Sequence, residues 1–379
     1  MWIFYSVPLL LRKGLRVKMD AKYKKLAAQL TELIAMNLHS GIYKLPTEAE
    51  LGRRYHVSRQ TVRQALSLLS SQGLITTRQG SGSYVTGFSE NGSGSTIALL
   101  IRSEQEYIYP ELTNQLRLAL SEKGYTLQVF STENQVARER EILTELLALP
   151  PKGIFVEPCK SALPSPNIEL FDKLHRQDIP FVFLYSCYSA LPWAVCVKSD
   201  NDYGGYLLAQ HLSTQGHTQI AGMFQIDDLQ GIERYYGFLN YMRDAGHMLP
   251  DDRIGWFTSS ELNLLEQKQD SRFLSEFIHR QLPACTAILC QNDEIAYWII
   301  KELAYSGLKV PQGVTVVCFG ESYLSELSHI RITALTHRPH AVARCAADCM
   351  LRSLQKLTVS SQEIPWELAI RESDAALES

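Results

Sequence analysis

Residues 45–86 read LPTEAELGRRYHVSRQTVRQALSLLSSQGLITTRQGSGSYVT, and this stretch decides the fold of the amino-terminal part of the chain. Thr47 precedes a run of helix-forming residues and has Glu50 three residues later, which is the sequence pattern of a capping box. Ser58 follows the turn residue Val57 and is placed to cap a second helix. The stretch therefore predicts two short helices joined by a tight turn.

The second predicted helix has one apolar and one polar face. Val62, Leu66 and Leu69 recur at helical spacing and should pack against a core. The opposite face carries arginine, glutamine and serine: Arg59, Gln60, Arg63, Gln64 and Ser67. In the major groove of DNA, arginine can form paired hydrogen bonds with guanine, and glutamine with adenine. We therefore predict that this helix reads DNA bases.

The residues after the second helix predict a β-hairpin. Gly73 ends the helix, and short β-forming runs follow at 74–78 and 83–86. Residues 79–82, QGSG, join these runs with glycines that tolerate the positive φ of a tight turn. Two capped helices followed by a hairpin predict a winged helix-turn-helix domain over residues 19–87.

The segments LPTEAEL, VSRQTVRQAL, GLI and RQGSGSYV resemble the GntR family of bacterial regulators in order and spacing, over about residues 22–87. The resemblance implies that Arg59, Gln60 and Arg63 of the reading helix and Gln79 and Gly80 of the wing tip contact DNA. We add the capping residues Thr47 and Ser58 to the expected DNA-binding set. Ala49 stands where many family members have arginine, so the operator sequence does not follow from the resemblance. An alternative is that Arg59 and Arg63 only decorate a solvated helix face, but the complete pattern of helices and wing disfavours it.

Charge divides the chain in the same way. Residues 19–88 carry nine basic and four acidic side chains, whereas residues 89–379 have a net charge of −12 and the whole chain −3. A basic domain attracts DNA phosphates, and an acidic domain is repelled by them. The sequence therefore predicts a DNA-binding domain joined to a domain with another task.

The remaining features describe the chain as a whole. Its 379 residues, 45% hydrophobic and 20% charged, have the composition of a globular protein with more than one domain. Residues 1–18, MWIFYSVPLLLRKGLRVK, lack the order of a signal peptide and are predicted to be an extension, with Met19 as an alternative start. The Gly/Ser-rich residues 88–95 predict a flexible linker. No stretch of about 20 apolar residues exists, so we expect a cytoplasmic protein without a membrane partner.

Catalytic and metal-binding signatures are not found in the sequence. Its eight cysteines are scattered through apolar runs, which predicts reduced thiols. Cys345 and Cys349 lie one helical turn apart, but no CxxC or nearby histidine pair completes a metal site. The nucleophile elbow, the phosphate-binding loop, HExxH and GxGxxG are absent. We therefore expect no enzyme activity, no metal and no cofactor other than a small-molecule effector.

From residue 96 onward, short apolar runs alternate with segments of helical periodicity. TIALLI at 96–101 and VTVVCFG at 314–320 are two of the apolar runs, and DYGGYLLAQHLSTQG at 202–216 is one helical segment. Alternating strands and helices predict parallel sheets covered on both faces, which is a doubly wound α/β fold. The length of 96–376 suffices for two such lobes around a cleft. This domain is expected to bind the effector and to dimerise.

Polar and aromatic residues follow the predicted strands, where ligands of such folds bind. They are Tyr107, Tyr109, Glu157, Lys160, Asp200, Asn292, Asp293 and Glu321. Carboxylates, amides and amines can hydrogen-bond adjacent hydroxyls, and an aromatic ring can cover the C–H face of a sugar. The set therefore fits a polyol.

Simpler roles for the same residues remain open. Asn292 and Asp293 can cap the helix that follows them. Glu157 and Lys160 can form a surface ion pair. Arg234 can anchor its own helix to a neighbour.

The segments QHLSTQGHTQIAGMF, GIERYYGFLNYMRDAG and AILCQNDEIAYWIIKELAYSGLKVPQGVTVVCFG resemble the effector domain of the LacI/GalR family, whose fold is of the periplasmic-binding type. The resemblance implies that Arg234 binds the effector, that Asn292 and Asp293 form the strand-end pair, and that His337 closes the pocket. Glu157 and Lys160 match the arabinose-repressor subgroup. Gly320 and Glu321 stand where the family has paired aspartates, so Glu321 substitutes for one of them or the ligand differs.

The combined resemblance implies a repressor of carbohydrate utilisation genes that an inducer, L-arabinose first, releases from double-stranded operator DNA. A single reading head buries little surface, so a homodimer on a two-fold operator is expected. Two alternatives are another effector in the same architecture, such as a purine, amino sugar or disaccharide, and a sugar-metabolising enzyme fused to a DNA-binding head.

Overall fold

The computed structural model describes residues 23–24, 26–27, 29–30, 45–71, 75–78, 82–85, 95–104, 107–281, 284–320, 322–327 and 329–377. The chain divides into two compact units, residues 1–92 and 93–379. The extension predicted at 1–18 lies outside the described residues, as does the linker predicted at 88–95 except for Ser95.

The amino-terminal unit has the predicted helices and hairpin. Helix α2 (Glu48–Arg54) begins at the capping box of Thr47, and α3 (Arg59–Ser71) follows the turn. Strands β1 (Ile75–Arg78) and β2 (Gly82–Val85) pair antiparallel. The apolar face of α3 joins a core with residues of the other elements: Leu26, Leu30, Leu51, Val62, Leu66, Leu69 and Ile75. The winged helix-turn-helix prediction is therefore confirmed.

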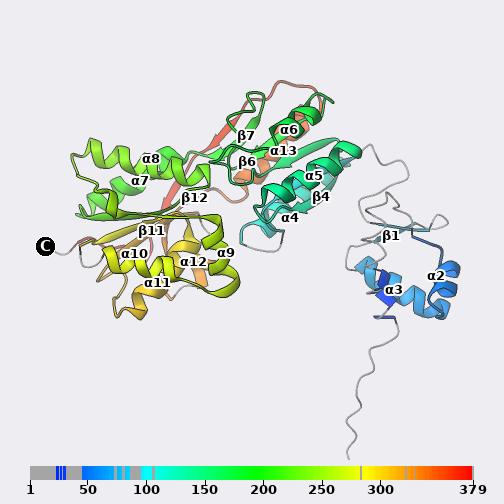
Figure 1. Ribbon diagram of the computed structural model, residues 1–379, viewed down its shortest axis with the longest axis horizontal. Helices are drawn as coiled ribbons and strands as arrows, with labels where there is room; N and C mark the ends of the chain where they lie inside the picture. The colour runs from blue at the N-terminus through cyan, green and yellow to red at the C-terminus, as the bar shows by residue number, and fades with distance from the viewer. Residues whose placement is uncertain are drawn as a thin grey trace, which may run out of the picture. The chain divides into compact units, whose positions relative to one another are not determined.

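The carboxy-terminal unit contains two six-stranded sheets, one in each of two lobes (Figure 1). The first lobe has the strand order β13-β7-β6-β5-β3-β4, and every pair is parallel. Its strands are β3 (Thr96–Ile101), β4 (Thr126–Ser131), β5 (Gly153–Val156), β6 (Phe181–Leu184), β7 (Val195–Ser199) and β13 (Gln362–Ile364). Helices α4 (Tyr109–Ser121) and α13 (Ala341–Leu354) pack in one core cluster, and α5 (Val136–Ala148) and α6 (Ile168–His175) in another.

The second lobe has the strand order β14-β12-β11-β10-β8-β9. Its strands are β8 (Ile220–Gln225), β9 (Ile254–Phe257), β10 (Ala287–Cys290), β11 (Thr315–Phe319), β12 (Thr333–Thr336) and β14 (Glu367–Ala369). The edge strand β14 runs antiparallel to β12, whereas only parallel strands were predicted. Besides the four helices that cover its sheet, this lobe contains the helical segments η1 (Asp251–Arg253), α9 (Ser259–Lys268) and α12 (Tyr323–Leu327).

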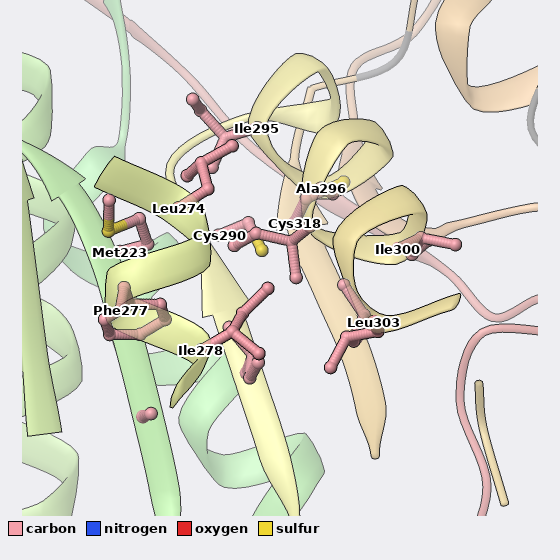
Figure 2. Close-up of a cluster of buried hydrophobic side chains, with 14 of the residues drawn as sticks. Met223, Leu274, Phe277, Ile278, Cys290, Ile295, Ala296, Ile300, Leu303 and Cys318 are labelled. Carbon is pink, nitrogen blue, oxygen red and sulfur yellow. The ribbon is translucent and has the colours of Figure 1, made fainter. Parts of the chain in front are cut away.

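Helices cover both faces of the second sheet. Helices α7 (Asn201–Thr214) and α8 (Leu229–Asp244) lie on one face, and α10 (Arg272–Gln281) and α11 (Asp293–Tyr305) on the other (Figure 1). Figure 2 shows apolar side chains of α10 and α11 meeting Cys290 and Cys318 of the central strands. Burial on both faces explains why these strands are continuous apolar runs in the sequence.

The polypeptide crosses between the lobes three times. Asp200 joins β7 to α7, residues 337–340 join β12 to α13, and Pro365 and Trp366 join β13 to β14. The two-lobed α/β prediction is confirmed. Within the described residues, no helix is long and apolar enough to cross a membrane.

Helices α7 and α8 approach each other at the level of their backbones. A Cβ atom on Gly205 would lie 2.1 Å from the carbonyl oxygen of Arg234, and one on Gly237 would lie 1.8 Å from that of Asp202. Real Cβ atoms do not come this close to a backbone oxygen, so only glycine fits at these crossings. The contact fixes the position of Arg234 on α8.

We expect Gly205→Ala to destabilise the chain because the added methyl forces α7 and α8 apart. Overpacking of this kind costs about 1–3 kcal/mol. Urea unfolding of the full chain, followed by circular dichroism, measures the loss. Gln210→Ala, on the exposed side of α7, is the matched control and should change stability little. Equal stability of the two variants would show that the helices can separate without cost.

Candidate functional site

The reading helix α3 presents the predicted polar face to solvent. Arg59, Gln60 and Arg63 are exposed, and the guanidinium Nε of Arg63 lies 2.9 Å from a carboxylate oxygen of Glu48 on α2. The hydroxyl of Ser58 accepts a hydrogen bond from the Thr61 N–H at 3.2 Å.

Both helix caps are made by hydroxyl side chains. The hydroxyl of Thr47 accepts from the Glu50 N–H at 3.3 Å, and the Glu50 carboxylate accepts from the Thr47 N–H at 2.8 Å. In the structure, the side chains of Thr47 and Ser58 therefore cap the amino-terminal ends of α2 and α3. The predicted wing-tip residues Gln79 and Gly80 lie outside the described residues.

A cavity of about 910 Å³ lies between the lobes of the carboxy-terminal unit. Seven of the predicted ligand-binding residues line it: Tyr107, Tyr109, Glu157, Lys160, Arg234, Asn292 and His337. The sequence reasoning missed several others that border it: Arg102, Asn134, Ser161, Tyr185, Gln225, Asp228, Gln230, Gln291, Phe319 and Trp366. Arg102, Tyr185, Gln225 and Gln291 end or directly follow strands, so the signal used for the predicted residues could have found them.

Of the other predicted residues, Asp200 and Asp293 do not line the cavity. Asp200 caps α7, where its side chain accepts from the Tyr203 N–H at 3.2 Å, so its assignment to the ligand site is corrected. The crossover that leads from β7 into α7 gives Asp200 this capping position. Glu321 lies outside the described residues. Its neighbour Gly320 has φ 75°, a left-handed conformation that favours glycine over a residue with a side chain.

Asp293 is fully buried and lies behind the cavity wall rather than in it. Its carboxylate accepts hydrogen bonds from the Tyr107 hydroxyl at 2.5 Å, from the Ser322 N–H and hydroxyl at 2.6 Å each, and from the Ser325 hydroxyl at 2.9 Å. These four donors leave it little capacity for a ligand. Asn292 lines the cavity and also caps α11, because its side chain accepts from the Ile295 N–H at 2.9 Å.

Glu157 is a half-buried acceptor that directly follows β5. One carboxylate oxygen accepts from the Tyr109 hydroxyl at 2.8 Å and the other from the Arg102 N–H at 2.9 Å. Burial is the largest cause that raises the pKa of Glu157 to about 6. The alternative of a surface ion pair with Lys160 is wrong, since both oxygens of the half-buried Glu157 carboxylate take these other partners. The Lys160 N–H donates to the Asn134 side chain at 2.8 Å.

Arg234 brings a buried guanidinium to the cavity. It is 7% exposed and donates to the Asn201 side chain at 2.9 Å, to the Gln291 carbonyl at 2.6 Å and to the Gln230 side chain at 3.0 Å. No carboxylate of the described residues forms an ion pair with it. Burial is the largest cause that lowers its pKa. The bond to Asn201 of α7 also confirms the simpler role of helix anchor.

His337 belongs to one crossover segment and contacts Ser199, which directly precedes the second, and Pro365 and Trp366 of the third. Its Nδ1 lies 2.9 Å from the Pro365 carbonyl and its Nε2 lies 2.8 Å from the Ser199 hydroxyl. A carbonyl can only accept, so Nδ1 carries the proton and Nε2 of the neutral ring accepts from Ser199. The ring stacks on Trp366 with centroids 3.8 Å apart, and burial lowers the pKa of His337.

Polar contacts hold the lobes together around the cavity. Besides the bond from Tyr107 to Asp293, the Ser161 hydroxyl donates to Asp228 at 2.8 Å. The Asn134 amide donates to the Ser259 hydroxyl at 2.7 Å, and Arg102 forms an ion pair with Glu266 of α9. The lobes are therefore closed on each other in this structure.

Glu294 lies beside the ion pair of Arg102 and Glu266. It is 6% exposed, and one of its carboxylate oxygens has no hydrogen-bond partner. Burial, followed by the charge of Glu266, raises the pKa of Glu294 to about 8. Near neutral pH, Glu294 is therefore mostly protonated in the folded chain.

Because the folded-state pKa of Glu294 is raised, its protonation stabilises the fold fully below pH about 4.5, and this stabilisation is lost as the pH rises through about 8. Glu294→Gln stays neutral at every pH. We expect the difference in melting temperature, variant minus wild type, to increase as the pH rises from about 5 to about 9. Glu302→Gln, in the same helix, is the control. A difference in melting temperature that is independent of pH would contradict the assignment.

Metal-binding groups of histidine, cysteine, aspartate and glutamate were not found among the described residues. All eight cysteines are free. The reduced-thiol prediction therefore agrees with the structure.

Comparisons with known proteins agree with the two units. Residues 22–85 match the gntR family of bacterial regulatory proteins, and residues 209–373 match the periplasmic binding protein-like domain. A crystal structure of a periplasmic binding protein/LacI transcriptional regulator from Alkaliphilus metalliredigens, complexed with D-xylulofuranose, is 20% identical with a TM-score of 0.61. The match covers 74% of this chain and 99% of that chain, and it shows the shared fold.

Two relatives extend over nearly the whole chain. The arabinose metabolism transcriptional repressor of Halalkalibacterium halodurans is 31% identical over 374 residues, which cover 95% of this chain and 98% of the relative. The repressor of the same name from Geobacillus stearothermophilus is 30% identical over 341 residues, which cover 89% and 92%. The chain therefore belongs to the family of DNA-binding transcriptional regulators, represented by these repressors, that join a GntR-type winged helix-turn-helix to a periplasmic-binding-protein-like domain.

Proposed function

We propose that the chain is a sugar-responsive repressor of carbohydrate utilisation genes in the cytoplasm. A homodimer binds a two-fold operator through its winged helices, and a sugar, L-arabinose first, binds between the lobes and releases the DNA. The two relatives that are 30% or more identical to this chain are named arabinose metabolism transcriptional repressors, which favours this sugar.

The observation that carries the proposal is the buried guanidinium of Arg234 at the cavity. It has no carboxylate partner among the described residues, and three of its N–H groups are used by the protein. Two N–H groups remain for an acceptor on a ligand, since a guanidinium has five. Phe319 and Trp366 lie beside it, with ring centroids 4.6 Å and 5.8 Å from the guanidinium carbon. A charged donor among aromatic rings is typical of sites that hold a sugar.

Other cavity residues add the groups that a polyol requires. Glu157 is a half-buried acceptor, Asn292 offers an amide, and Lys160 offers an amine. Tyr107 and Tyr109 border the cavity, and their hydroxyls are already bonded to the protein, so their rings are the parts left for a ligand. We assign His337 to the closure of the pocket through the hinge, and we retain Glu321 as a further candidate acceptor.

The exposed face of α3 supports the assignment of DNA contacts. Arg59, Gln60 and Arg63 extend from one side of this helix, and its other side is buried in the domain core. We propose that these three residues enter the major groove and that Gln79 and Gly80 contact the minor groove.

The domains are proposed as winged helix-turn-helix over 19–87, linker over 88–95 and effector-binding and dimerisation domain over 96–376.

The proposal is tested by titrating L-arabinose into the free protein and into its complex with operator, a DNA duplex that the full chain selects from a random library. Reciprocity requires that a sugar which weakens DNA binding is itself bound more weakly on DNA, by the same factor. We expect a factor of about 5–150. Equal dissociation constants would exclude allosteric induction, and tighter binding on DNA would make the sugar a corepressor.

A second titration tests the pocket. Arg234→Lys keeps the charge but loses the forked donors, so we expect unchanged operator affinity and a loss of response to L-arabinose. Arg243→Lys, an exposed position of the same helix α8, is the matched control. A purine, an amino sugar and a disaccharide complete the panel. Binding of one of these in place of every pentose would change the proposed ligand.

The ion pair of Arg63 with Glu48 predicts opposite changes in operator affinity when one or the other of its two residues is replaced. Arg63→Ala and Arg59→Ala should weaken operator binding by about 1–3 kcal/mol each. Glu48→Gln frees Arg63 and removes a negative charge near the DNA, so it should tighten binding. Fluorescence anisotropy at moderate salt measures all three, with Arg117→Ala in the other unit as control. Unchanged affinity of Arg63→Ala would mean that α3 is not the reading helix.

A further inference from the structure

Two glutamines at the carboxyl ends of neighbouring parallel strands differ in how their side chains are held. Gln225 ends β8, and its amide donates to Asp227 and to Ser259 at 3.0 Å each. Gln291 directly follows β10, the neighbour of β8, and its side-chain oxygen has no hydrogen-bond partner. Both residues border the cavity between the lobes.

The position of Gln291 is fixed through its backbone. Its N–H donates to the Met223 carbonyl at 2.8 Å, and its carbonyl accepts from the Arg234 guanidinium at 2.6 Å. The residue is only 3% exposed. An amide oxygen buried without a partner is costly, and proteins normally satisfy such groups with the protein, water or a ligand. The cavity at this position is where a ligand can supply the missing donor.

The neighbouring charge limits which ligand group can do so. Arg234 has unused N–H groups that seek an acceptor, whereas the Gln291 oxygen seeks a donor. A ligand ammonium would suit the oxygen but be repelled by the guanidinium. A carboxylate or phosphate would suit the guanidinium but has no proton for the oxygen. A hydroxyl can donate to Gln291 and accept from Arg234 at the same time.

We infer that Gln291 is a specificity-determining residue of the effector site, where it accepts a hydrogen bond from one hydroxyl of a neutral sugar that also accepts from Arg234. This inference rests on the proposed function, since it takes the cavity as the sugar site. It adds a residue outside the sequence-derived set, and it assigns a hydroxyl, rather than a carboxylate, phosphate or ammonium group, to this position of the ligand.

The experiment measures binding of L-arabinose and its monodeoxy analogues to the full chain by calorimetry. In the wild type, we expect the analogue that lacks the hydroxyl at Gln291 to bind about tenfold more weakly than L-arabinose. Gln291→Met keeps the length of the side chain but removes the acceptor, so the affinity of this variant for L-arabinose should fall by a similar factor. This variant should no longer distinguish that analogue, while it still distinguishes the others.

Two further variants complete the test. Gln291→Glu keeps an acceptor and should retain the discrimination, and Gln210→Leu, at an exposed position of α7, should behave as wild type. Melting temperature and operator binding establish that each variant folds, and Gln291→Leu replaces the methionine variant if that one does not.

The outcomes separate this inference from the proposed function. If the wild type binds L-arabinose and Gln291→Met retains the same preference over every analogue, the role of Gln291 is wrong and the proposed function stands. If the wild type binds no neutral sugar, both are overturned. Loss of discrimination at a single hydroxyl supports both, because a purely structural role would weaken all the sugars alike.

Discussion

The arrangement of the carboxy-terminal unit depends on how His337 ties the three segments that join its lobes. Within the part of the chain that the structure describes, these segments are the only covalent connections between the two sheets, so any movement of one lobe relative to the other must rotate about them. The neutral imidazole bonds Ser199, which directly precedes one segment, and Pro365 of another, and it stacks on Trp366. The segments are therefore held as one hinge. Trp366 also lies beside the guanidinium of Arg234, which places the hinge in direct contact with the proposed effector site.

The position of Arg234 has its own cause in the packing of α7 against α8. Glycines at the crossing bring the two backbones into contact, and this places the Arg234 side chain within reach of Asn201 and of the end of β10. A buried cation is expensive unless polar groups surround it. Here neutral oxygens of Asn201, Gln230 and Gln291 do so, and they leave donors unused at the cavity. The neutral partners compensate the buried charge of Arg234 only in part. The N–H groups that they leave unused are the ones that can bind a ligand.

The closed lobes are held by groups of differing chemistry. Tyr107 reaches from the first lobe to the buried carboxylate of Asp293 in the second, and Ser161 reaches to Asp228. Arg102 meets Glu266 beside Glu294, where burial and the charge of Glu266 raise the pKa of Glu294 and so disfavour a second negative charge. Some residues that the sequence suggests as ligand contacts therefore form bonds that hold the two lobes together. Asp293 is the clearest case, because four donors saturate it.

The sequence by itself determined the local features: the capped helices and hairpin of the head, the strand and helix periods of the body, and the strand-end position of residues such as Glu157 and Asn292. These follow from patterns of neighbouring residues, in which burial and capping leave a periodic signal. Only the tertiary structure decided that Asp293 lies behind the wall and that Gln291 and Trp366 border the cavity. The reason is that the direction of a side chain at a strand end depends on contacts between segments far apart in the chain, and no local pattern records them.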